Sequence, residues 1–202
     1  LALGNYLLEA HRTQDPGVTA RATSIAQYIG ADQAAFDAAT LWVKLDDENP
    51  QAQISLSQEL IKASRFSEST LHLQKALDLD PNVNLSFISM QGAHMTEGAR
   101  ELWLENLVPL RATYTKNEGL LYNLATLHQQ QENHQAALDF VNELLDLNEE
   151  FYPAWTMKAR IQATLGDNNG SLSTIEKALT QYENDKSLML LKARLHIKKK
   201  EI

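Results

Sequence analysis

The chain has 202 residues, 44% of them hydrophobic and 22% charged, and these proportions are typical of a folded protein. Its net charge of −8 argues against a nucleic-acid partner, because such binding depends on basic side chains that neutralise phosphates. The chain contains no cysteine, which excludes disulfides, zinc sites with cysteine ligands and a thiol nucleophile, and no apolar stretch approaches the ~20 residues that span a membrane.

A period of 34 residues runs along the chain. Lys158-Ala159-Arg160 recurs as Lys192-Ala193-Arg194, and Pro16 and Pro50 have the same spacing. A fixed period of this length is typical of a solenoid, in which helical hairpins stack on their neighbours. We therefore predict one all-α solenoid over residues 1–202, with full units at 16–49, 50–83, 84–117, 118–151 and 152–185. Residues 1–15 are then the second helix of a truncated unit, and residues 186–202 the first helix of a sixth.

The spacing of apolar residues predicts a first and a second helix in each regular unit. In the opening half-unit, Ala2, Tyr6 and Ala10 share one helix face. Further helices are expected at about 18–29, 33–45, 51–63, 67–79, 118–131, 134–147, 153–165, 168–182 and 186–199. Small residues recur at the twentieth place of most units, where two helices can approach closely: Ala35, Ser69, Ala137 and Ser171.

The unit at 84–117 departs from this pattern. Gln91 and Trp103 occupy the small places, Gly92 and Gly98 weaken or end the first helix, and Pro109 falls inside the second. We expect a wider hairpin or a bent second helix here. Two interpretations are open: ordinary drift of a repeat, or a change of curvature that shapes a binding surface.

The two ends of the chain suggest a fragment, because it starts without Met and stops inside a repeat. Solenoid ends normally carry a polar capping face. Leu188, Leu191 and Leu195 of the last helix are expected to be partly exposed. This predicts further residues after Ile202, or a contact with another molecule such as a second copy. Lys198-Lys199-Lys200 is expected to be a solvated helix end.

Two units carry the residues of a known repeat. They are Trp155, Ala159, Gly166-Asp167, Ile175 and Ala178-Leu179 in one unit, and Leu56, Phe66, Leu73, Ala76-Leu77 and Leu79-Asp80-Pro81 in the other. This pattern resembles the tetratricopeptide repeat (TPR) family over nearly the whole chain. The resemblance implies a right-handed superhelix of antiparallel helix pairs whose first helices line a concave groove. It also implies binding of peptides or proteins, no catalysis and no cofactor.

A narrower resemblance concerns the opening residues, Ala2 to Leu7, Asp15-Pro16-Gly17-Val18 and Arg21-Ala22. They are similar to proteobacterial outer-membrane TPR lipoproteins, some of which are adaptors for carboxyl-terminal-processing proteases. This implies a periplasmic protein tethered by a missing lipidated N-terminus, with a protease or its substrates as partner. The Lys/Asn carboxylate clamp of another TPR subgroup is absent, since Ala20, Ser24, Ile54 and Gln58 stand on that face.

The groove face is the candidate binding site, because places five, nine and twelve of each first helix lie on one side. The residues that we expect to bind a partner are Gln58, Met95, Tyr122, Thr126, Gln129, Thr156, Arg160 and Arg194. Amides, hydroxyls and apolar groups suit a peptide, and the two arginines suit its carboxylates. The alternative is that these side chains only face water.

Other candidate sites are explained by structure alone. His94, His128 and His196 recur at one place of their units, where each is expected to replace a half-buried aromatic residue rather than bind a metal. The carboxylates of Asp46-Asp47-Glu48 and Glu149-Glu150 are expected to be solubilising turn residues. The sequence therefore predicts a non-catalytic protein-binding scaffold. Two alternatives are a TPR appendage of an enzyme whose catalytic domain lies outside this fragment, and a helical-repeat reader of RNA.

Overall fold

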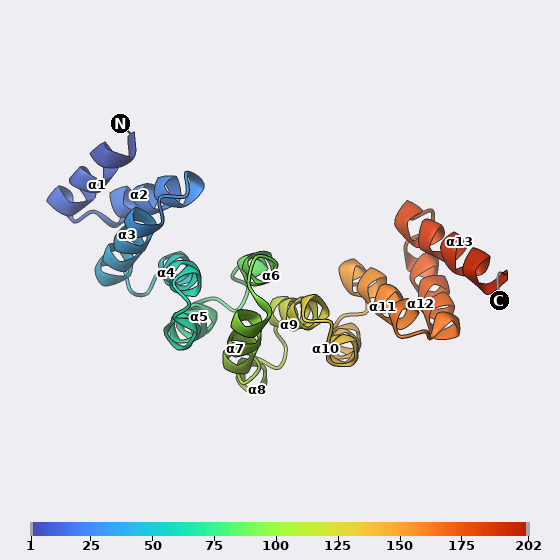
Figure 1. Ribbon diagram of the computed structural model, residues 1–202. Helices are drawn as coiled ribbons and strands as arrows, with labels where there is room; N and C mark the ends of the chain where they lie inside the picture. The colour runs from blue at the N-terminus through green and yellow to red at the C-terminus, as the bar shows by residue number, and fades with distance from the viewer. Residues whose placement is uncertain (1, 201–202) are drawn as a thin grey trace. The chain divides into compact units, whose positions relative to one another are not determined.

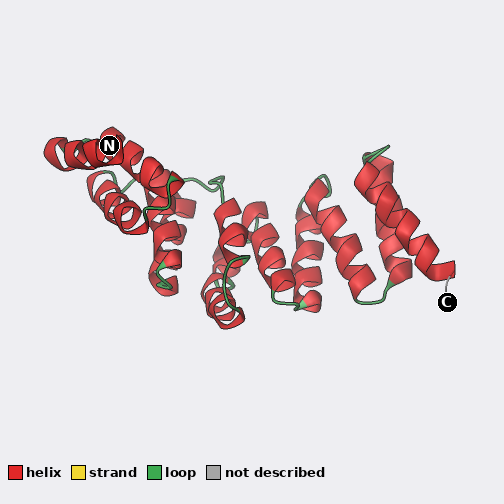
Figure 2. Cartoon of the chain, turned by 45° about the horizontal axis from the view of Figure 1, so that its top comes forward, coloured by secondary structure: helices red, strands yellow, loops and turns green. Residues whose placement is uncertain are grey.

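The computed structural model describes residues 2–200, without the side chains of residues 198–200, and this part of the chain consists of helices and connecting turns (Figures 1 and 2). Lys198-Lys199-Lys200 closes the last helix, and the prediction for its side chains lies outside the described residues. The fold is all-α and built mainly of paired helices. It divides into two compact units, with the division between Leu110 and Arg111.

The first compact unit holds α1 to α7. Their bounds are Ala2–Thr13, Pro16–Tyr28, Asp32–Leu45, Pro50–Lys62, Phe66–Leu79, Ser86–Gly92 and Glu97–Leu107. Helix α8, Leu110–Thr113, spans the division. The second unit holds α9 to α13, with bounds Glu118–Gln130, His134–Leu147, Tyr152–Thr164, Asn168–Gln181 and Lys186–Lys200. The helix positions expected in the regular units are confirmed to within two residues at each end.

The same local conformation returns at the turn inside each regular hairpin. Gly30, Ser64, Glu132 and Gly166 all have positive φ, at 70°, 58°, 59° and 85°. A residue in the left-handed conformation reverses the chain after a helix. Here these residues are separated by 34 residues or a multiple of 34. Helix starts recur in the same way, because Asp15 and Asn49 accept hydrogen bonds from the backbone at the beginnings of α2 and α4, each followed by proline.

Two buried serines each form a hydrogen bond that links the two helices of a hairpin. Ser69 on α5 donates to the carbonyl oxygen of Ser57 on α4 at 3.0 Å, and Ser171 on α12 donates to that of Ala159 on α11 at 2.7 Å. Both serines are almost fully buried. The small side chain lets the two backbones approach closely, and its hydroxyl then satisfies a carbonyl that it would otherwise cover.

Ion pairs also repeat between consecutive hairpins. Lys75 on α5 contacts Asp47 in the turn before α4 at 2.7 Å, and Lys177 on α12 contacts Glu149 in the equivalent turn before α11. The hydrogen bond from Lys75 lowers the pKa of Asp47. Glu48 and Glu150 are exposed in the same turns. The carboxylate runs are turn residues, as predicted, and some of them also link neighbouring hairpins.

The irregular unit at 84–117 has a short first helix and a divided second segment. Helix α6 ends at Gly92, and Arg100 of α7 donates to the carbonyl oxygens of Gly92 and Met95, both at 3.0 Å. Helix α7 ends before Pro109, which lacks the backbone N–H that a continuous helix needs. Trp103 is fully buried and stacks on Phe66 with ring centroids 6.1 Å apart. Helix α7 packs against α5 and α6 against α4, so the expected disruption of the hairpin is present.

The two end helices each bury only some of their apolar residues. Helix α1 packs on α2, and of the three residues that share one face of α1, Ala10 is buried whereas Ala2 and Tyr6 are exposed. On α13, Leu188 and Leu195 are buried at 1% and 5% exposure, so the expectation that they are partly exposed was wrong. They pack into the core of the second unit, which also holds Trp155, and the exposed apolar residues of this helix are instead Met189, Leu190 and Ile197.

Candidate functional site

The first helices of the second unit carry six of the predicted binding residues. Tyr122, Thr126 and Gln129 lie on α9, Thr156 and Arg160 on α11, and Arg194 on α13. The first four are half-buried, and both arginines are exposed. Gln58 and Met95 belong to the first compact unit and are described with it below. That the six residues form one binding surface stays a prediction.

Several of these side chains are already engaged within the second unit. The Tyr122 ring packs on Phe151 with centroids 5.4 Å apart. The hydroxyl of Thr126 donates to the Tyr122 carbonyl oxygen at 2.8 Å, and that of Thr156 donates to Pro153 at 2.9 Å. Their methyl groups and remaining lone pairs, and the face of Tyr122, can still contact a ligand.

Arg160 and Arg194 supply positive charge in an acidic protein. Within the part of the chain that the structure describes, neither guanidinium forms an ion pair with a carboxylate. An unpaired guanidinium can bind a carboxylate with two parallel hydrogen bonds. These two arginines can therefore attract and orient an acidic group of a partner.

A tyrosine pair lies beside Arg160 where α11 and α13 begin. The Tyr152 hydroxyl donates to Asp185 Oδ2 at 2.9 Å, and the ring meets Tyr182 edge to face at 5.0 Å. Burial and then the bond to Asp185 raise the pKa of Tyr152, while the charge of Arg160 acts in the opposite direction. This contact fixes the turn at 183–185 against α11.

In the first unit, Gln58 and Met95 are both half-buried. Gln58 accepts a hydrogen bond from Gln27 Nε2 at 3.2 Å through its side chain, and one from Gln91 Nε2 at 3.3 Å through its carbonyl. Met95 lines a cavity of about 500 Å³, and the residues around it are Ile61, Lys62, Ser64, Phe66, Gln91, His94, Met95, Thr96 and Ala99. Helix α6 ends beside this space, so the irregular unit contributes to the cavity.

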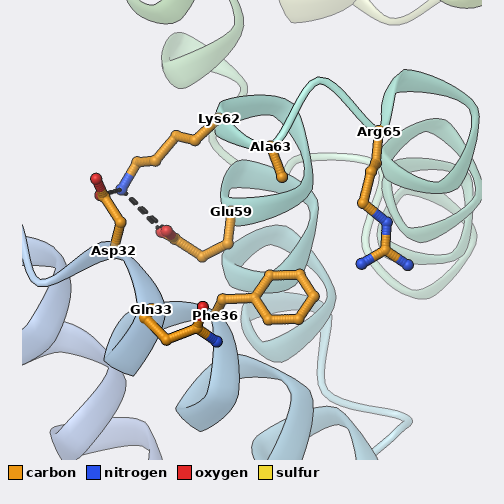
Figure 3. A pocket seen from close by; sticks show the side chains of 7 residues that line it. All are labelled: Asp32, Gln33, Phe36, Glu59, Lys62, Ala63 and Arg65. Atoms are coloured by element: carbon orange, nitrogen blue, oxygen red, sulfur yellow. Dashed lines mark hydrogen bonds and ion pairs between the residues drawn. The ribbon is translucent and has the colours of Figure 1, made fainter.

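A second cavity of the first unit was missed from the sequence. It has a volume of about 320 Å³ and is lined by Asp32, Gln33, Phe36, Glu59, Lys62, Ala63 and Arg65 (Figure 3). Glu59 is only 2% exposed although it is charged. The helical pattern of α4 gave no sign of this burial, because the hydrogen bond that Glu59 accepts from Gln27 comes from another helix, α2.

The histidine prediction holds for one residue of three. His128 is half-buried and stacks on Phe140 at 5.4 Å, and burial lowers its pKa. His94 and His196 are exposed, so they do not replace a packed aromatic residue. Among the described residues, no three histidine, aspartate or glutamate side chains are grouped closely enough to hold a metal ion.

Comparison with known proteins identifies the repeat. The family model of the tetratricopeptide repeat matches residues 119–151 and 152–185. A TPR repeat-containing protein of Pseudomonas aeruginosa is 29% identical over 190 residues, which is 94% of this chain and 32% of that protein. The chain thus spans about a third of the length of the curated relative that it matches. None of the described helices combines the length and apolar character needed to cross a membrane.

Solved structures share the fold at low identity. A C-terminal part of a TPR protein from Cytophaga hutchinsonii has a TM-score of 0.53 at 16% identity, over 89% of this chain and 72% of that one. YrrB, a TPR protein with an unusual peptide-binding site, has a TM-score of 0.50 at 14% identity, over 96% and 97%. Residues 119–185 therefore match the model of the tetratricopeptide repeat family, and the chain has the all-α fold of a TPR solenoid.

Proposed function

We propose that this chain is a non-catalytic scaffold that binds a protein or peptide through the first-helix face of its second unit. The observation that carries the proposal is the pair of exposed arginines, Arg160 and Arg194, beside the half-buried polar face of α9 and α11. Peptide binding by YrrB is an instance of this use of the fold. The partner that these groups suit is an extended or helical segment with acidic residues.

Charge reversal tests this surface. Arg160→Glu combined with Arg194→Glu should weaken binding of acidic peptides by roughly tenfold or more, mainly through faster dissociation and weaker steering. The measurement is fluorescence anisotropy with a panel of labelled peptides of equal length that differ in their number of glutamates. Arg21→Glu combined with Lys116→Glu is the matched control, since it makes the same change of net charge at exposed residues elsewhere. Equal affinities of the two double variants would refute the proposed surface.

The finer proposal is an adaptor role in a bacterial envelope. Similarity to outer-membrane TPR lipoproteins in the opening residues supports it, and it gives a carboxyl-terminal-processing protease, or its substrates, as the partner. The test is to mix the chain with a carboxyl-terminal-processing protease from the organism that encodes the chain, and to measure the rate at which the protease cleaves its substrate. The chain should bind the protease and raise this rate. A rate that does not change at saturating concentration of the chain speaks against the adaptor role, while leaving the peptide-binding scaffold open to its own test.

A further inference from the structure

The smaller cavity of the first unit contains a buried carboxylate. Glu59 projects from α4 toward the preceding hairpin, where its Oε1 accepts a hydrogen bond from Gln27 Nε2 at 2.9 Å. Lys62 Nζ lies 3.0 Å from Glu59 Oε2. Burying a charged group costs several kcal/mol unless hydrogen bonds and an opposite charge offset the lost hydration (~3–5 kcal/mol when a partner is missing). The site is therefore built around a negative charge.

The opposite charge of Lys62 is shared between two carboxylates of the lining. The ammonium of Lys62 also contacts Asp32 Oδ1 at 3.3 Å, so two carboxylates converge on one cation (Figure 3). Arg65, the other cation of the lining, is bound to Glu68 by hydrogen bonds of 2.7 and 2.6 Å and so does not compensate them. A second cation entering the cavity would complete the neutralisation of Asp32 and Glu59.

The remaining walls suit a long cationic side chain. Phe36 provides an aromatic surface, and the guanidinium carbon of Arg65 already lies 5.4 Å from its ring centroid. Lysine and arginine bury their aliphatic stems against apolar surface while the charged head remains with polar groups. A cavity of about 320 Å³ can hold one such side chain.

The adjoining cavity indicates that the cation belongs to a protein. Lys62 lines both cavities, so they are neighbours. The larger one has apolar walls from Ile61, Phe66 and Met95, and no carboxylate lines it. A free amine or metal ion would use only the acidic cavity. A polypeptide with a basic residue next to a large apolar residue would fill both.

We propose that Asp32 and Glu59 bind a lysine or arginine side chain of a partner protein, and that the cavity at Met95 receives the neighbouring apolar side chain. This site lies within residues 1–110 and is independent of the arginine-bearing surface of the second unit, so either proposal can fail without the other. The two surfaces together would select a partner with separated basic and acidic segments.

The test is titration of the full chain with N-acetyl-argininamide, followed by NMR of its backbone amides. Shifts should concentrate at Gln27, Phe36 and Glu59, and N-acetyl-citrullinamide, which has the same shape without the charge, should not produce them. N-acetyl-leucyl-argininamide should bind more tightly and extend the shifts to Phe66 and Met95. Equal shifts with the citrulline compound, or preferential binding of N-acetyl-glutamate amide, would overturn the proposal.

Variants separate the proposed contact from general attraction. Glu59→Gln keeps the shape of the side chain and should lower the affinity for N-acetyl-argininamide roughly tenfold or more. Glu101→Gln, an exposed carboxylate of the same unit, is the matched control and should not change it. If circular dichroism shows that Glu59→Gln unfolds the unit, Asp32→Asn is the deciding variant, because Asp32 is exposed and its replacement should not disturb the fold. Asp32→Asn should lower the affinity for N-acetyl-argininamide about threefold. Unchanged affinity in a folded variant contradicts the proposal.

Discussion

At the scale of single residues, the turn inside each regular hairpin holds one residue in the left-handed conformation, whatever its type. Gly30 and Gly166 adopt the left-handed conformation without a steric penalty, whereas Ser64 and Glu132 adopt it against their intrinsic backbone preference. The sequence indicated the turns with glycine as helix ends. It could not indicate the other two, because neither serine nor glutamate is characteristic of positive φ.

This strain predicts that Glu132→Gly stabilises the protein by about 0.5–1 kcal/mol, since relief of the left-handed penalty exceeds the added chain entropy of glycine. Gly166→Ala should destabilise it by about 1 kcal/mol. A Cβ atom added at Gly166 would meet nothing within 4 Å, so that loss is conformational and not steric. Urea unfolding followed by circular dichroism measures both changes. Glu132→Ala controls for the removed charge and should bring no gain.

At the scale of elements, regular hairpins were predictable and the irregular one only in part. Helical spacing and turn residues located the helices of the regular units, because each 34-residue stretch repeats the same local signals. Trp103 and Pro109 correctly indicated a disturbed hairpin at 84–117. That α6 ends at Gly92, and that Arg100 folds back to cap it, depends on contacts between segments. Local pattern carries no information about such contacts.

The close approach of paired helices depends on the small residue at the second helix, and this can be tested at Ser171. Ser171→Ala removes the hydrogen bond to the Ala159 carbonyl and should cost about 1 kcal/mol. Ser171→Leu forces a large side chain into the contact and should cost about 1–3 kcal/mol more. Thermal unfolding measures the difference. A leucine variant as stable as the alanine variant would show that α11 and α12 do not need a small residue here.

At the scale of the whole molecule, the candidate sites show what a repeat pattern can and cannot reveal. Helical periodicity placed the arginines of α11 and α13 alike, because they lie one period apart at the same place of the repeat, and both are exposed. The cavity at Glu59 is lined by residues of two hairpins that differ in type between repeats, such as Asp32 and Lys62. A site made from departures between repeats leaves no periodic signal, so only the coordinates reveal it.

The division into two compact units predicts that stability is local. In a solenoid, each hairpin gains its stability from itself and its immediate neighbours, so damage should spread only a short distance. Leu144 on α10 is fully buried in the core of the second unit, and Leu144→Ala should cost about 2–5 kcal/mol there. Hydrogen exchange measured by mass spectrometry should then become faster in α9 to α12, while α2 to α5 keep their protection. Leu73→Ala in α5, also fully buried, is the reciprocal variant and should reverse the pattern. If either substitution accelerates exchange equally in both units, the chain unfolds as one cooperative body, and the two binding surfaces are then coupled through its stability.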